Sequence, residues 1–215
     1  MRMPFARSGL SREQKDRLDA WRSLPDAKSD ARIVVLDVET TGLDLVRDRL
    51  ISVGAVGVVN GHIALSEGFS VVLKQGRASS RENILIHGIT GDEQRDGLPP
   101  ADALLDFLEY LGKSPLAAFH VEFDETMIRR AMKEYLGFSF RHRWLDLAYA
   151  LPALWPDLSL RTLDEWTEHF SIGNDERHNA ASDALATAGL LLVALKGRNY
   201  ERLRSIASRR ALEYP

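Results

Sequence analysis

Cysteine is missing from this sequence of 215 residues, and long apolar runs are missing as well. Without cysteine the chain can form neither a disulfide nor a thiolate metal site. Its apolar runs are much shorter than the roughly 20 residues that span a bilayer. The first residues also lack the apolar stretch of a secretion signal. We therefore expect a cytoplasmic protein that has no membrane partner.

The chain also has little net charge. Its formal net charge is −3, from 28 Lys and Arg against 31 Asp and Glu. No broad basic surface is expected to attract nucleic acid from a distance. A polyanionic substrate would have to be held locally, by metal ions and a few Arg or Lys side chains.

The order of the predicted elements indicates one α/β domain with a mixed sheet. An antiparallel meander comes first, with Asn60-Gly61 as a type I′ hairpin signal. Later strands alternate with helices, one of which is predicted at 123–136. This order is typical of a mixed sheet flanked by helices. The strands are predicted at about 32–38, 50–59, 62–73, 116–119 and 143–146.

Segments at both ends extend this domain. Residues 1–30 are interpreted as an N-terminal extension with one helix at 11–24, for which Ser11 is a suitable N-cap. Residues 31–197 form the main domain in this division. Residues 198–215 are interpreted as a basic C-terminal helix packed on it.

The most informative residues follow a predicted buried strand and read Asp37-Val38-Glu39-Thr40-Thr41-Gly42. Because side chains alternate along a strand, Asp37 and Glu39 should emerge on the same face. Two carboxylates this close repel by roughly 3–4 kcal/mol at an effective dielectric of about 20. The pair therefore needs a proton or a cation, and oxygen ligands suit Mg²⁺ or Mn²⁺. The alternative is a strand end with solvated acids, and the Thr-Thr-Gly that follows argues against it.

Two further carboxylates and one histidine could join this pair. Asp183 is predicted at the edge of the apolar face of a helix that begins near Asn179, where a charge must be paired or metal-bound. A salt bridge to an arginine is the alternative there. His178 precedes that helix and is suited to accept a proton near neutral pH. Asp124 follows the strand at 116–119, where α/β domains place their sites, although it could instead be a helix N-cap.

Together with Ile86-His87-Gly88-Ile89-Thr90, these motifs resemble those of the DEDDh exonucleases. This DnaQ-like family includes the proofreading ε subunit of bacterial DNA polymerase III. Order and spacing match over about residues 32–196. The resemblance implies an RNase H-like fold, a mixed five-stranded sheet flanked by helices. It also implies a 3′–5′ exonuclease that releases nucleoside 5′-monophosphates from single-stranded DNA or DNA 3′ ends.

The resemblance further implies a role for each motif. Two divalent ions, Mg²⁺ or Mn²⁺, would be bound by the carboxylates of Asp37, Glu39, Asp124 and Asp183. His178 would be the general base. Contacts to the substrate would come from Thr40, Thr41, Gly42, His87, Ile89 and Phe123. The family commonly has His-Asn where this chain has Phe119-His120, and His120 could replace that Asn as a hydrogen-bond donor to substrate.

Three questions stay open at this level. An exoribonuclease of the RNase T or oligoribonuclease type would carry the same motifs, because a contact to the 2′-OH depends on local geometry. A proofreading subunit of a DNA polymerase is a second alternative, although the short segment after the last motif helix favours a free-standing enzyme. No motif indicates the oligomeric state or a preference for single or double strands.

Overall fold

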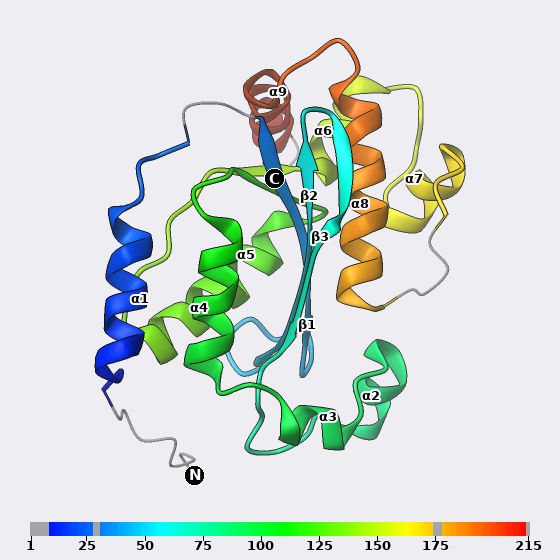
Figure 1. The fold of residues 1–215 in the computed structure, drawn as a ribbon. Coiled ribbons are helices and arrows are strands. Elements are labelled where there is room, and N and C mark those ends of the chain that lie inside the picture. The colour runs from blue at the N-terminus through cyan, green and yellow to red at the C-terminus, as the bar shows by residue number, and fades with distance from the viewer. Residues whose placement is uncertain (1–8, 28–30, 174–177, 214–215) are drawn as a thin grey trace.

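The computed structural model describes residues 9–27, 31–173 and 178–213. Within them, five strands form one sheet in the order β3-β2-β1-β4-β5 (Figure 1). β1 to β3 are antiparallel neighbours, whereas β4 and β5 run parallel to β1. The predicted mixed sheet is therefore confirmed. The strands are β1 (Arg32–Thr40), β2 (Leu50–Val59), β3 (His62–Val72), β4 (Leu116–Ala118) and β5 (Trp144–Asp146).

The hairpin between β2 and β3 has the backbone that its sequence predicts. Asn60 and Gly61 have φ angles of 49° and 77°, and a type I′ turn requires positive φ at both central residues. β2 is buried along nearly its whole length because β1 and β3 flank it and a helix crosses one face.

Helices cover both faces of the sheet and enclose two apolar cores (Figure 1). Because side chains alternate along β1, Val34 and Leu36 enter the first core, whereas Ile33 and Val35 enter the second. The first core is covered by α1 (Arg12–Ser23), α4 (Pro100–Leu111) and α5 (Val121–Ala131). The second is covered by α6 (Leu147–Leu154), α7 (Leu163–His169), α8 (Ala180–Leu195) and α9 (Tyr200–Glu213).

The predicted N-terminal helix is present as α1 and lies against α4. Ser11 is its N-cap and forms a capping box with the first turn. Trp21 Nε1 donates a hydrogen bond to the carbonyl of Gly112 at 2.7 Å. Arg17 adds ion pairs to two acids of α4. The helix is therefore attached to the main domain by both apolar and polar contacts.

The helices differ from the predicted ones in two places. The helix predicted at 123–136 is two pieces, because α5 ends at Ala131 and a π-helical segment, Met132–Leu136, follows it. Two short helices, α2 (Arg81–His87) and α3 (Gly91–Asp96), lie between β3 and α4, where the apolar pattern predicts none. Both are too short for apolar periodicity to reveal them.

Among the described residues, no single helix is long and apolar enough to cross a membrane. α8 and α9 pass that test only as a pair, and the pair is bent by 99°.

Candidate active site

Three carboxylates meet at the end of β1. Asp37 and Glu39 continue the row of Ile33 and Val35, so they project from the face of the sheet that α8 covers. Asp183 lies in the first turn of α8 and is only 6% exposed. One oxygen from each of these three carboxylates lies within 4.8 Å of the others. The sheet and one helix thus bring together acids that are far apart in sequence.

A missing side chain allows α8 to approach the sheet this closely. Gly54 on β2 pairs with Asp37 on β1. A Cβ atom at Gly54 would overlap the backbone of Ala180 and Ala181, in the first turn of α8. Glycine is therefore required here if Asp183 is to reach Asp37.

Polar groups fix the start of α8. Asn179 is the N-cap, and its Oδ1 accepts hydrogen bonds from the N–H groups of Ala181 and Ser182. Asp183 Oδ2 accepts the backbone N–H of His178 at 3.1 Å. This bond places the exposed His178 beside the acidic group.

Asp124 lies near the three carboxylates but outside their close group. It is on α5 and is not the N-cap, which is His120. The side chain is buried, and it accepts a hydrogen bond from the backbone N–H of Val38 on β1. Burial, reinforced by the charges of Asp146 and Glu39, raises the pKa of Asp124 well above its ordinary value. The site therefore favours a proton or a cation at this carboxylate.

Asp146 joins the end of β5 to the start of α5. Its carboxylate accepts backbone N–H groups from His120 at 3.2 Å, Val121 at 2.9 Å and Ala148 at 2.9 Å. Burial raises the pKa of Asp146, although these hydrogen bonds oppose the effect. No role in the site is predicted for Asp146 from the sequence, although an Asp between a strand and a helix is a recognisable capping signal.

The Thr-Thr-Gly segment is ordered by its own hydroxyls. Thr40 Oγ1 donates to the carbonyl of Gly42 at 2.7 Å. Thr41 Oγ1 donates to Asp48 Oδ1 at 2.8 Å and accepts the N–H of Arg49 at 3.0 Å. The segment therefore keeps one shape before any ligand binds.

Two side chains from helices hold the loop that follows this segment. Asn83 of α2 donates to the carbonyl of Thr41. Arg130 of α5 donates to three backbone carbonyls, those of Leu45, Val46 and Asp48. Neither residue can be predicted from the sequence, because their partners are backbone atoms that are distant along the chain and leave no motif.

His87 lies under the turn between α2 and α3. Its side chain is 4% exposed, its Nδ1 accepts the N–H of Ile89 at 3.0 Å, and its Nε2 lies 3.1 Å from Ser79 Oγ. Burial lowers the pKa of His87. Little of this ring is left for a substrate to contact, whereas Ile89 is only half-buried.

The two remaining substrate candidates lie at the start of α5. Phe123 is half-buried against the first core. His120 is exposed and has φ 66° and ψ 58°, in the left-handed region. Asn and His are among the non-glycine residues that adopt this conformation most readily. The left-handed backbone at position 120 therefore explains why the chain can have His there, where DEDDh exonucleases commonly have Asn.

The donor set fits a hard divalent cation. Three carboxylates with oxygens within 4.8 Å of one another repel unless a positive charge lies between them. Mg²⁺ and Mn²⁺ prefer such oxygen ligands.

This sheet and this acidic group define the class of RNase H-like nucleases. An exonuclease family model, named for RNase T, matches residues 34–191. The chain belongs to this family, that of the DnaQ-like 3′–5′ exonucleases.

Similar proteins include polymerase components. The chain is 30% identical over 168 residues to the DNA polymerase III subunit epsilon of Aquifex aeolicus, covering 78% of this chain and 82% of that protein. It is 33% identical over 175 residues to the PolC-type DNA polymerase III of Thermotoga maritima. That match covers 80% of this chain but only 12% of the polymerase.

Solved structures share the fold at low sequence identity. Exonuclease X in complex with 5′ overhanging duplex DNA has a TM-score of 0.65 and 21% identity, covering 82% of this chain and 98% of that one. Exonuclease I of E. coli in complex with a dA16 oligonucleotide has a TM-score of 0.67 and 21% identity, covering 81% and 42%. These likenesses confirm the RNase H-like fold.

Proposed function

We propose that this protein hydrolyses single-stranded DNA or DNA 3′ ends to nucleoside 5′-monophosphates, working from the 3′ end. The observation that carries the proposal is the close group of Asp37, Glu39 and Asp183 at the end of β1. Family membership supports the exonuclease chemistry. The choice of DNA is supported by relatives named as components of DNA polymerase III and by similar structures that hold DNA.

Two divalent ions, Mg²⁺ or Mn²⁺, are the proposed cofactors. Asp37, Glu39 and Asp183 would hold one, and Asp37 with Asp124 would hold the other. When bound, such ions lower the pKa of the attacking water and offset the charge on the leaving 3′ oxygen. Without a cation, the carboxylates would repel the phosphate of the substrate.

His178 is the proposed general base. Its backbone is hydrogen-bonded to Asp183, and its side chain is exposed beside the acidic group. Imidazole is the side chain most often used as a general base, and here it would take a proton from the attacking water.

Thr40, Thr41 and Gly42 are proposed to position the 3′-terminal nucleotide. Their hydrogen bonds fix the loop in advance, so little conformational entropy is lost when the substrate binds. Ile89 and Phe123 would pack against base or sugar, which tolerates any base. We propose that His87 acts by holding the turn before Ile89, and that His120 donates a hydrogen bond to the substrate.

A second candidate function is proofreading beside a DNA polymerase. The observation that favours it is the naming of the relatives as epsilon and PolC-type components of DNA polymerase III. Stable co-elution of the full chain with a polymerase catalytic subunit would support it. Exonuclease activity at full rate without any polymerase would favour a free-standing enzyme.

One assay tests the leading proposal. Matched 5′-labelled single-stranded DNA, duplex DNA and RNA are digested with Mg²⁺, with Mn²⁺ or with EDTA. We expect stepwise shortening of single-stranded DNA from the 3′ end, only with a metal ion, and none with Asp37→Ala. Faster digestion of RNA would assign the RNA alternative. Activity retained in Asp37→Ala would contradict the proposed site.

A further inference from the structure

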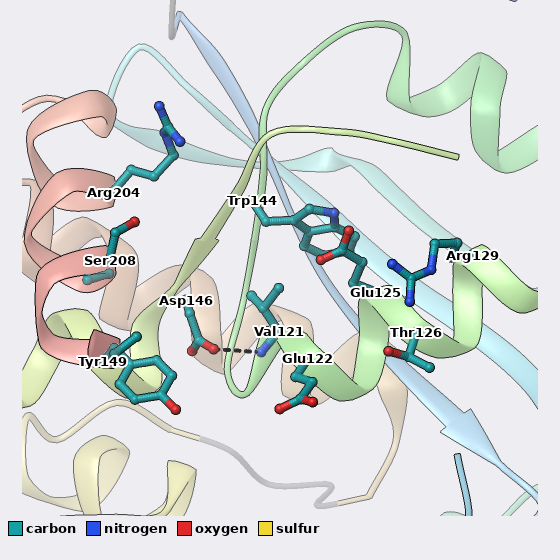
Figure 2. Close-up of a pocket in the computed structure, with 12 residues that line it drawn as sticks. Val121, Glu122, Glu125, Thr126, Arg129, Trp144, Asp146, Tyr149, Arg204 and Ser208 are labelled. Carbon is teal, nitrogen blue, oxygen red and sulfur yellow. Dashed lines mark hydrogen bonds between the residues drawn. The ribbon is translucent and has the colours of Figure 1, made fainter. Parts of the chain in front are cut away.

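A cavity of about 430 Å³ lies between α5 and α9, beside the edge strand β5 (Figure 2). Sites for small molecules typically have volumes of roughly 300–1,000 Å³. We call this cavity the α5–α9 pocket and define it by six of its lining residues. They are Glu122, Glu125 and Arg129 of α5, Trp144 of β5, and Arg204 and Ser208 of α9.

The charged residues on the α5 wall have no partner in the part of the chain that the structure describes. Glu125 and Arg129 are four residues apart, a spacing at which helices usually form ion pairs. Neither side chain makes a hydrogen bond or an ion pair with a described residue, and the same is true of the Glu122 side chain. In Figure 2 these side chains extend from α5 on one side of the pocket. Three charges thus remain available to a ligand.

The opposite wall carries a fixed cation and an exposed hydroxyl. Arg204 is held by Glu201, which accepts hydrogen bonds from its Nε at 3.0 Å and its Nη2 at 2.8 Å. Ser208 is exposed one helical turn further along α9. α9 therefore supplies a guanidinium whose orientation is already fixed.

Between the two walls, Trp144 supplies an aromatic surface. Its Nε1 is buried and has no hydrogen-bond partner among the described residues. Because that nitrogen is inaccessible, the half-buried ring, and not the N–H, is the part of Trp144 that a ligand can contact.

These groups select a ligand by its chemistry. Arg129 requires an anionic acceptor, the indole of Trp144 favours a flat ring, and the two glutamates require N–H or O–H donors. A simple anion would leave the indole and the glutamates unused. A simple cation would use the acidic side chains but leave Arg129 without an acceptor. A nucleotide offers all three groups, in its phosphate, its base, and its sugar hydroxyl or base amino groups.

We propose that the α5–α9 pocket binds one nucleotide, with its phosphate on Arg129 and its base against Trp144. The pocket adjoins the candidate active site, because Asp146 lines it and also accepts the N–H groups that start α5, the helix of Asp124. The identity of the ligand rests on the proposed function, which makes nucleotides both substrate and product. The bound nucleotide is either a free monophosphate or part of a strand.

Binding measured in EDTA tests this proposal separately from catalysis, because no hydrolysis is needed. The probes are dAMP and a 5′-labelled oligothymidylate, and the variant is Arg129→Gln at an exposed position. Arg202→Gln is the matched control, since Arg202 is an exposed arginine of α9 that does not line the pocket. We expect Arg129→Gln to weaken binding at least about tenfold, and the control to leave it unchanged.

The two probes distinguish a free nucleotide from a nucleotide within a strand. Weakening of dAMP binding alone identifies a free nucleotide, and weakening of oligothymidylate binding alone identifies a nucleotide within the strand. Unchanged binding of both probes in Arg129→Gln would overturn the proposal, as would equal weakening by Arg202→Gln. Quenching of tryptophan fluorescence by dAMP should be lost in Trp144→Phe if the pocket is the site. The proposed function is tested by a separate experiment and fails if Asp37→Ala keeps its nuclease activity.

Discussion

The carboxylate of Asp48 lies directly against Gly42. A Cβ atom at Gly42 would be 2.5 Å from Asp48 Oδ2, so no other residue type fits there without movement. Asp48 Oδ1 accepts the hydroxyl of Thr41 at 2.8 Å, and Oδ2 accepts the N–H of Asp44 at 2.8 Å. The Asp48 side chain therefore ties Thr41 to the loop that follows the Thr-Thr-Gly segment.

Asp48→Ala should impair catalysis more than it impairs folding. Loss of the carboxylate frees Thr41 and the loop, so the substrate end is positioned less well. We expect kcat/KM to fall by about ten- to a hundredfold, since small misplacements have effects of this size. Steady-state kinetics and thermal unfolding would be measured together, with the exposed Asp16→Ala as control. An unchanged kcat/KM would contradict this role.

Gly54→Ala should separate the acids. The added methyl overlaps the first turn of α8, so the helix must move away from β2 and carry Asp183 from Asp37. We expect a loss of about 1–3 kcal/mol in unfolding free energy, typical of overpacking, and a strong loss of activity. Gly68→Ala on β3 is the control, because its Cβ meets only a carbonyl oxygen at 3.5 Å. Equal effects of the two changes would argue against close approach at Gly54.

Asp124→Asn should abolish activity yet stabilise the metal-free protein. The folded state raises the pKa of Asp124, so it favours the protonated form. In EDTA, stability is therefore lost as the pH rises through that raised pKa. At neutral pH we expect the variant to gain on the order of 1 kcal/mol, measured by urea unfolding. The exposed Asp157→Asn should change neither property. A destabilised Asp124→Asn would contradict the expectation.

Acid should loosen the turn between α2 and α3. Burial lowers the pKa of His87 below its ordinary 6.5, and Nδ1 must be unprotonated to accept the N–H of Ile89. The contribution of His87 to the free energy of unfolding is therefore fully present above the ordinary pKa of histidine. It is lost as the pH falls below that value and through the lowered pKa. The protection factor of the Ile89 amide against hydrogen exchange, which allows for the slower intrinsic exchange in acid, should fall between about pH 7 and pH 5. In His87→Gln this fall should disappear. Burial also lowers the pKa of His142. Because the unchanged protein and His87→Gln both contain His142, its protonation cannot account for a difference between them.

The sequence predicts the parts of the fold that depend on local rules. Alternation along β1 puts Asp37 and Glu39 on one face, and Asn60-Gly61 specifies the hairpin turn. Asp183 is recognisable because a charge at the edge of an apolar helix face needs a partner. Each of these features is encoded within a few neighbouring residues.

The features that the sequence does not predict depend on contacts between distant segments. Arg130 binds backbone carbonyls of a loop more than 80 residues away, as in its hydrogen bond to Asp48, 82 residues distant. Carbonyl groups are present at every residue, so such a contact has no sequence signature. The π-helical segment that follows α5 is likewise not marked in the apolar pattern, which predicts one continuous helix there. The α5–α9 pocket exists only because β5 is an edge strand between two helices.

The central claim is that Asp37, Glu39 and Asp183 form one metal-dependent hydrolytic centre. The most direct measurement is single-turnover shortening of 5′-labelled single-stranded DNA from its 3′ end across a Mn²⁺ titration. Asp183→Asn is compared with the exposed Asp157→Asn. We expect saturable Mn²⁺ dependence in the unchanged protein and in Asp157→Asn, and a rate at least about a thousandfold lower in Asp183→Asn. Equal rates in Asp183→Asn and the unchanged protein, or full activity in EDTA, would contradict the claim.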